Sequence, residues 1–434
     1  MYPDQSGAKG KKIDFFDGAA PGVEFIGGGV TRALGVSVGS AHAGFRKNAS
    51  KDDLTIVAVP EGTVAAGVFT QNRFCAAPVT VCRERLADPH VRAIILNSGN
   101  ANAATGDIGM ADAIRTTEMV ADALGVDSDD VLVASTGVIG VPFDMSCFER
   151  GIPMAVEDLG PDDGTDIEGG LASAKAIMTT DTVCKQCAVE FSAVQSDGTE
   201  MDYHIGGMAK GSGMIEPNMA TMLAVVATDA PLDPAAAKDA LVAATNVSFN
   251  RVSVDSDTST NDSLYLLATG AAGGETIEAS HPAFASFVDA LKTLCISLAR
   301  QMAADGEGAT KLVTVRITGA ADDEQAYMAA RSVANSPLVK TAIAGHDANW
   351  GRLAMALGKS GAVFAQEDVS ISLMGLEVCR GGLPVEFDEE EALRRFEEDE
   401  IVITADLGCG ASASTMWTCD FTHGYITING DYRT

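Results

Sequence analysis

Residues 210–230 read KGSGMIEPNMATMLAVVATDA, and this stretch decides how the chain is organised. Its first part, residues 210–220, is small, polar and rich in glycine, which is typical of a loop. Thr221 then precedes an apolar run at 222–227, which predicts a buried strand. One interpretation is that Thr221 only caps that strand. The other is that the chain breaks before Thr221, which becomes a new N-terminus.

A threonine at a new N-terminus can act as a nucleophile. Cleavage after Ala220 frees an α-amine whose ordinary pKa is about 7.7–8.0, near the pH at which a general base must work. Nucleophile and base then belong to one residue, an arrangement suited to acyl transfer. The cleavage can be autocatalytic, because the Thr221 hydroxyl can attack the carbonyl of the small Ala220 and form an ester that water releases. We therefore expect the chain to be cut between Ala220 and Thr221.

The charge and composition of the chain exclude several classes of protein. The 434 residues carry 60 acidic and 30 basic side chains, a formal net charge of −30. Nucleic-acid phosphates and anionic membranes would repel such a chain, so neither is an expected partner. It has no apolar run of about 18 residues and no recognisable targeting segment, so we expect a cytoplasmic protein. The cysteines include one CxxC pair, Cys184 and Cys187, which without further ligands predicts reduced thiols and no metal.

Alternating helical and strand-like patterns predict an α/β protein. Runs of β-branched residues bounded by Gly, Asn or Asp predict strands at 54–59, 91–96, 131–134, 222–227, 263–268, 312–317, 369–373, 401–405 and 424–428. Spaced apolar residues predict helices at 110–124, 234–244, 284–304, 324–333 and 388–395. The segment GRLAMALGKS (351–360) looks like a phosphate-binding loop, but its glycine spacing is wrong and a helix with a basic end fits better.

Segments spread over nearly the whole chain resemble one known family. GGMAKGSGMIEPNMATML (206–223) is similar to the cleavage segment of the ornithine acetyltransferases, enzymes of the acetylated cycle of arginine biosynthesis. The chain departs from that family in the TVCKQC segment (182–187) and in Gly430, where many relatives carry Ala. The other similar segments follow in the family's order: AAGVFTQNRFCAAPV (65–79), ILNSGNANAATG (95–106), ASTGVIG (134–140), IMTTDT (177–182), VSVDSDTSTNDS (252–263), DGEGATKLV (305–313), DANWGR (347–352) and ITINGDYRT (426–434).

The resemblance implies a fold, a maturation step and a reaction. The fold is an αββα sandwich, in which two sheets pack together with helices outside. Autocleavage yields the fragments 1–220 and 221–434, which assemble as two copies of each. The acetyl group of N²-acetylornithine passes to Thr221, ornithine leaves, and glutamate takes the acetyl group. We expect no cofactor; some members also accept acetyl-CoA as a donor substrate, and the sequence leaves this choice open.

Three residues receive catalytic roles from the resemblance. Thr221 is the nucleophile, and its α-amine is the base. Thr136 and Gly137 follow a predicted strand, where a hydroxyl and a backbone N–H can stabilise a developing oxyanion. Without the resemblance, these two residues would be interpreted as an ordinary turn at the end of the strand.

The resemblance also implies a set of substrate-binding residues: Thr179, Lys210, Thr221, Glu307, Asn429 and Thr434. Lys210 matches a ligand of the substrate carboxylate, and Glu307, between two glycines, matches a ligand of the substrate ammonium. Thr180 is the alternative to Thr179, because the sequence does not show which hydroxyl faces inward. We expect the Asn and Asp residues of 95–106 and 252–263 to form a scaffold of loops around the site.

Two other functions remain open from the residues alone. A self-processing aminopeptidase of the same broad fold would use the same nucleophile, with water in place of glutamate. A processed structural subunit would need Thr221 only for its maturation. The order of the similar segments favours the transferase, and a panel of acetyl donors and acceptors would separate the three.

Overall fold

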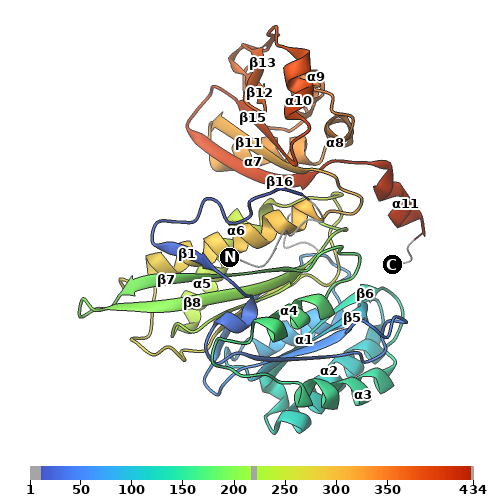
Figure 1. Ribbon diagram of the computed structural model, residues 1–434, viewed down its shortest axis with the longest axis vertical. Helices are drawn as coiled ribbons and strands as arrows, with labels where there is room; N and C mark the ends of the chain where they lie inside the picture. Colours follow the sequence, from blue (N-terminus) through green and yellow to red (C-terminus); the bar gives the residue numbers. More distant parts are fainter. Residues whose placement is uncertain (1–10, 217–221, 432–434) are drawn as a thin grey trace.

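A computed structural model describes residues 11–216 and 222–431 of the chain. These residues form three β-sheets and eleven α-helices. Two of the sheets, with the helices packed on them, make a larger lobe, and the third sheet belongs to a smaller lobe (Figure 1). None of the helices in these residues combines the length and the apolar content that crossing a membrane requires.

The first sheet lies at the centre of the larger lobe. Neighbouring strands in it are antiparallel except β9 and β10, which are parallel. The apolar run of β9 is buried on both faces: Val226 packs in the core with α5 (Pro234–Val247) and α6 (Phe284–Ala304), and Val225 packs toward the second sheet. The strand order is β1 (Val23–Ile26), β7 (Lys185–Val194), β8 (Glu200–Lys210), β9 (Leu223–Thr228), β10 (Ser263–Ala268) and β4 (Val64–Phe69).

The second sheet completes the sandwich. Its order is β2 (Ser37–Ala41), β3 (Leu54–Ala58), β5 (Ala93–Asn100) and β6 (Val131–Val138). The helices that share its core are α1 (Ala77–Arg85), α2 (Gly106–Leu124), α3 (Met145–Glu157) and α4 (Ile167–Ala176). Figure 1 shows α2 and α3 on the side of this sheet that faces away from the first sheet. Helices, two sheets and further helices thus follow one another, which confirms the predicted αββα sandwich.

The smaller lobe is an addition that the resemblance did not imply. Helix α6 joins this lobe to the larger one, because α6 packs on the first sheet and also contacts β11 and β16. Helix α9 confirms the helix that was predicted in place of a phosphate-binding loop. The strand order is β14 (Leu383–Pro384), β13 (Leu376–Arg380), β12 (Ser370–Leu373), β15 (Glu400–Asp406), β11 (Leu312–Ala320) and β16 (Ser412–Cys419). The helices are α7 (Asp323–Ala334), α8 (Pro337–Ala344), α9 (Trp350–Gly358) and α10 (Glu389–Arg395).

One predicted strand is wrong. Residues 424–428 belong to α11 (His423–Asp431), a helix without buried residues. The Thr422 hydroxyl accepts a hydrogen bond from the Gly424 N–H (3.0 Å), which caps the first turn. A strand gains its stability from packing and pairing with neighbours, and Ile426 in this segment is exposed. The β-branched residues of the segment therefore predicted a strand where no sheet lies beside it.

The predicted cleavage site falls between two neighbouring strands. β8 ends at Lys210 and β9 begins at Leu223, and these two residues pair in an antiparallel ladder. Ala220 and Thr221 lie outside the described residues, so the division into 1–220 and 221–434 stays a prediction. The first sheet takes strands from both predicted fragments, whereas the smaller lobe belongs to the second fragment alone.

Candidate active site

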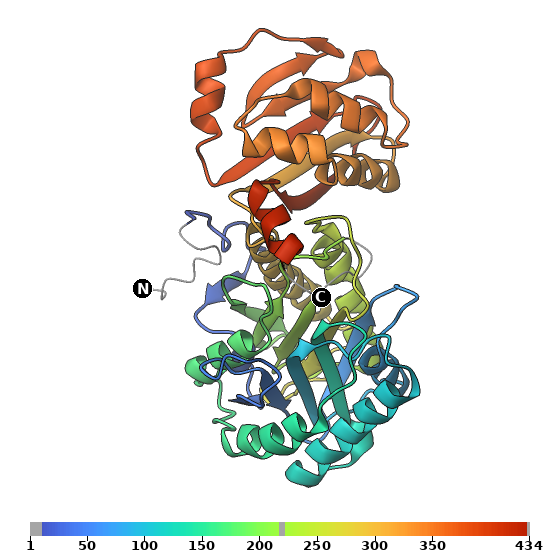
Figure 2. The ribbon, with the colours of Figure 1, turned by 90° about the vertical axis from the view of Figure 1, so that its right-hand side faces the viewer.

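Six of the predicted site residues line one cavity, which has a volume of about 240 Å³. They are Thr136, Gly137, Thr179, Lys210, Glu307 and Asn429. Both lobes contribute, because α11 follows the smaller lobe and reaches toward the larger one (Figure 2). The remaining predicted residues, Ala220, Thr221 and Thr434, lie outside the part of the chain that the structure describes.

Thr136 and Gly137 lie near the end of β6, where its pairing with β5 becomes irregular. The register shifts between Gly99 and Asn100, which makes a bulge opposite Thr136. Gly137 has a φ of 136°, which only glycine adopts readily, and a Cβ atom there would overlap the backbone of Gly99. Because a bulge redirects the residues beside it, this irregularity presents Thr136 and Gly137 to the cavity.

Lys210 brings a buried positive charge into the cavity wall. It is the last residue of β8, only 4% exposed, and its Nζ donates a hydrogen bond to Thr136 Oγ1 (3.3 Å). Burial lowers the pKa of Lys210, and the carboxylate of Asp181 opposes that shift. An ammonium group has three N–H donors, and within the described residues Thr136 occupies one. Lys210 is therefore suited to bind an anionic group of a ligand.

Glu307 and Asn429 form a second pair of polar groups in the cavity wall. Asn429 Nδ2 donates to Glu307 Oε2 (2.7 Å), so α11 meets the segment that follows α6. The Glu307 N–H donates to the Ser212 carbonyl (2.8 Å), which fixes its backbone. A Cβ atom at Gly213 would overlap the Glu307 carboxyl group, so glycine gives that side chain its room. The pair offers a carboxylate and an amide to a substrate.

Thr179 and Thr180 both line the cavity, so the choice between them stays open. The buried carboxylate of Asp181 holds Thr179 in place. The Thr179 N–H donates to Asp181 Oδ2 (2.9 Å), and the Thr179 hydroxyl lies 3.5 Å from the same oxygen. This contact fixes the loop between α4 and β7 on which both threonines lie.

Asp255 and Tyr425 also belong to the wall, although neither was predicted as a site residue. Asp255 accepts hydrogen bonds from the N–H groups of Met214 (2.6 Å) and Ile215 (2.9 Å), and the Tyr425 hydroxyl donates to it (3.3 Å). Burial raises the pKa of both the Asp255 carboxyl and the Tyr425 phenol. Asp255 therefore links α11 to the segment that precedes the predicted cleavage site. In the sequence Asp255 lies within the segment 252–263, which was expected only to form part of the scaffold of loops.

The expected scaffold of loops is visible around Asn261. Its Nδ2 donates to the carbonyl of Ala101 (2.6 Å) and to that of Ser135 (2.9 Å). One buried side chain thus joins the segments 95–106, 134–140 and 252–263 at the base of the cavity.

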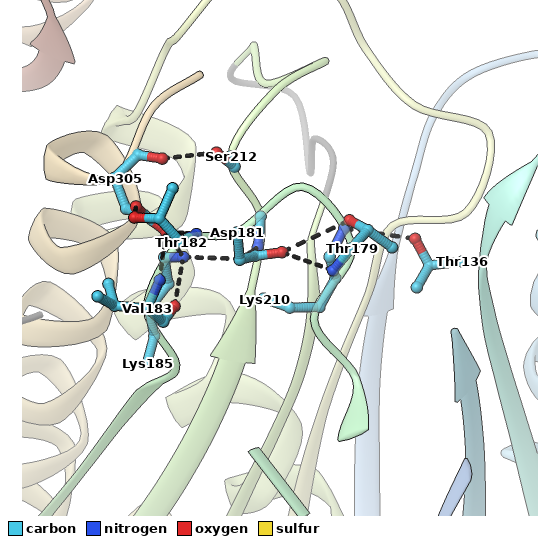
Figure 3. A network of polar contacts seen from close by, with 10 residues as sticks. Thr136, Thr179, Asp181, Thr182, Val183, Lys185, Lys210, Ser212 and Asp305 are labelled. Carbon is cyan, nitrogen blue, oxygen red and sulfur yellow. Dashed lines mark hydrogen bonds and ion pairs between the residues drawn. The ribbon is translucent and has the colours of Figure 1, made fainter. Parts of the chain in front are cut away.

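A buried ion cluster lies behind the cavity wall, and sequence reasoning missed it (Figure 3). Lys185 Nζ lies 2.7 Å from Asp181 Oδ1 and 2.6 Å from Asp305 Oδ2, and the three side chains are at most 3% exposed. Asp181 and Lys185 lie within or beside the IMTTDT and TVCKQC segments, while Asp305 lies far away in the chain. Cys184 and Cys187, beside Lys185, are free thiols.

Known proteins are similar to this chain over nearly its whole length. The family described as "ArgJ family" matches residues 37–434. The "Arginine biosynthesis bifunctional protein ArgJ" of Symbiobacterium thermophilum is 48% identical over 95% of this chain and 100% of that protein, and its namesake in Chlorobaculum tepidum is 46% identical over 88% and 92%. A crystal structure of ornithine acetyltransferase complexed with ornithine, from Mycobacterium tuberculosis, is 35% identical over 46% of this chain and 100% of that one, with a TM-score of 0.39. The chain therefore belongs to the ArgJ family of bifunctional arginine-biosynthesis proteins.

Proposed function

We propose that this ArgJ-family enzyme moves an acetyl group from N²-acetylornithine to glutamate through an acetyl ester on Thr221. One observation carries the proposal. A buried cation (Lys210), a carboxylate (Glu307) and a pair suited to an oxyanion (Thr136 and Gly137) line the same cavity, at the end of the strand that precedes the predicted cleavage site.

The first half-reaction acylates the enzyme. The α-amine of Thr221 takes the hydroxyl proton as the hydroxyl oxygen attacks the acetyl carbonyl carbon of N²-acetylornithine. The carbonyl oxygen becomes an oxyanion, which the Thr136 hydroxyl and the Gly137 N–H stabilise. The C–N bond then breaks, the proton passes from the α-amine to the departing nitrogen, and ornithine leaves.

The second half-reaction repeats these steps in reverse with glutamate. Its neutral α-amine attacks the ester carbonyl, the same pair stabilises the oxyanion, and the Thr221 oxygen regains a proton as the C–O bond breaks. Lys210 binds the α-carboxylate that both amino acids carry, while Glu307 and Asn429 bind the side-chain ammonium group of N²-acetylornithine, whose α-nitrogen carries the acetyl group. Because one cavity of about 240 Å³ serves both amino acids in turn, the kinetic scheme is ping-pong.

The proposal extends to the second donor and to the assembly. Acetyl-CoA acts as an alternative donor substrate, in keeping with the word "bifunctional" in the names of the relatives, and no cofactor takes part. The enzyme consists of two copies each of the fragments 1–220 and 221–434, and it works in the cytoplasm.

Mass spectrometry of the cleaved protein with N²-acetylornithine alone tests the proposal. We expect a burst of ornithine equal to the number of sites, and a 221–434 fragment that gains the mass of one acetyl group. Glutamate should then remove the adduct and yield N-acetylglutamate, whereas an aminopeptidase would lose it to water equally fast. The Thr221→Ala variant should stay full-length and form no adduct. Intersecting initial-rate lines without an adduct would mean direct transfer, and Thr221 would not be the acetyl carrier.

A further inference from the structure

The ion cluster of Asp181, Lys185 and Asp305 contacts the segments that carry three proposed substrate ligands, Thr179, Lys210 and Glu307. Asp181 lies on the loop between α4 and β7 and accepts two backbone hydrogen bonds. One comes from the N–H of Thr179 (2.9 Å), and the other from the N–H of Gly211 (2.8 Å), the residue after Lys210. A single buried carboxylate therefore fixes the positions of both the threonine loop and the end of β8 (Figure 3).

Asp305 extends the same cluster to Glu307. Its Oδ2 accepts a hydrogen bond from the Thr182 N–H (3.0 Å), and its backbone carbonyl accepts one from the Ser212 hydroxyl (2.6 Å). The Ser212 carbonyl in turn accepts the N–H of Glu307 (2.8 Å). Lys185, between the two aspartates, thus joins the segments of Thr179, Lys210 and Glu307 through charged groups away from water.

The cluster also sets the charge that surrounds Lys210. Burial lowers the pKa of Lys210, and Asp181 is the strongest of the groups that oppose this shift. Burial alone would raise the pKa of Asp181, but Lys185 and Lys210 hold it below its ordinary value. In the described residues four charged groups face Lys210: Asp181 from the loop after α4, Lys185 from β7, Asp262 before β10, and Glu307 after α6.

We propose that Asp181 and Lys185 are positioning residues of the transfer reaction, which hold Lys210 in register with Thr179 and Glu307. Asp181 is the negative charge that faces Lys210, and Lys185 holds that carboxylate in place through an ion pair. Neither residue touches substrate. The inference rests on the proposed role of Lys210 as the ligand of the substrate carboxylate.

A second buried aspartate provides a matched control. Asp229, at the other end of the β8–β9 pair, accepts hydrogen bonds from the backbone N–H of His204 (2.8 Å) and from its imidazole (2.9 Å). It is buried like Asp181, but it contacts His204, away from Lys210 at the end of β8. Asp229→Asn should therefore lower stability without changing how substrate binding depends on pH.

The test measures competitive inhibition by glutarate against glutamate between about pH 7 and pH 11, because glutarate has carboxylates but no amine to titrate in this range. Inhibition by glutarate weakens when Lys210 loses its proton. In Asp181→Asn we expect this loss to begin about 1–3 pH units lower than in the unchanged enzyme, since a neighbouring opposite charge shifts a pKa by that amount. In Lys185→Gln the loss should move to higher pH, because an aspartate stays ionised in this range and the variant removes only a like charge. Asp229→Asn should match the unchanged enzyme.

The two variants should shift the pH profile of glutarate inhibition in opposite directions. A general loss of stability would not do so, and the two explanations can therefore be distinguished. If Asp181→Asn does not fold, Asp181→Glu takes its place: it keeps the charge and should keep the profile while its affinity falls. Lys210→Met separates the two proposals. Should it leave inhibition by glutarate intact, the assigned role of Lys210 fails and this inference with it. Should it abolish inhibition while Asp181→Asn and Lys185→Gln leave the profile unmoved, only the positioning role is overturned.

Discussion

Gly213 shows how one hydrogen atom in place of a side chain shapes the cavity. A Cβ atom there would overlap the Glu307 carboxyl group, which is the end of a flexible side chain and can swing away. We expect Gly213→Ala to fold normally but to lose the contact between Glu307 and Asn429. Losing a hydrogen bond to a charged group costs about 1.5–3 kcal/mol, so KM for N²-acetylornithine should rise on the order of tenfold or more. Steady-state kinetics measures the change in KM, and the thermal midpoint shows whether the variant folds normally.

Gly358→Ala is the control for that experiment. Position 358 is the last residue of α9, and an added methyl group there meets nothing within 4 Å. It should leave both KM and the midpoint unchanged. A Gly213→Ala enzyme with an unaltered KM would show that the Glu307 carboxylate does not hold substrate.

Strands β8 and β9 are tied together by an ion pair whose strength depends on pH. The hydrogen bond to Asp229 raises the pKa of His204 above its ordinary value. A raised folded-state pKa means that the pair stabilises the protein fully below the unfolded value of about 6.5, and that this contribution is lost as the pH rises through the folded value. We therefore expect the thermal midpoint to fall above about pH 6.5 in the unchanged protein and to fall less in His204→Gln. Equal slopes in the two proteins would contradict this account.

The elements that the sequence predicts well are those whose pattern reflects burial. The predicted strand 263–268 coincides with β10, which is buried throughout, and the predicted helix 284–304 coincides with α6, of which most residues are buried. β8 escaped prediction because it contains Gly206 and Gly207, residues that are rare within strands. A Cβ atom at position 206 would overlap the backbone of Gly29, so close packing explains a glycine that the local pattern could not.

The whole molecule brings six of the predicted site residues together, but the resemblance to a family, and not the spacing of these residues, identified them. Local patterns predicted β6 and β9, yet no local signal joins Thr136 to Asn429. Asp181 and Asp305 were missed for the same reason, since their contact through Lys185 spans more than a hundred residues of chain. The order of the similar segments also did not reveal that a second lobe carries α11 to the cavity (Figure 2).

Maturation should leave one particle and not two. Across the predicted cleavage site β8 pairs with β9, and β10 pairs with β4, so the two strands of the second fragment lie between strands of the first within the sheet. We expect a denaturing gel to show two fragments, the second beginning at Thr221, and native gel filtration to keep them in a single peak. Thr221→Ala should run as one chain on both. Fragments that separate without denaturant, or a second fragment with another first residue, would contradict the prediction.

A break at the predicted position, between two neighbouring strands, also has a genetic consequence. Because the first sheet is built from both pieces, two separate genes, one for residues 1–220 and one starting with a methionine before Thr221, should yield products that meet as β8 and β9 do in the single chain. Removal of that initiator methionine would expose the threonine amine without any self-cleavage. Processing and turnover, which the proposed function assigns to one hydroxyl, would then become separable traits, each open to its own mutations.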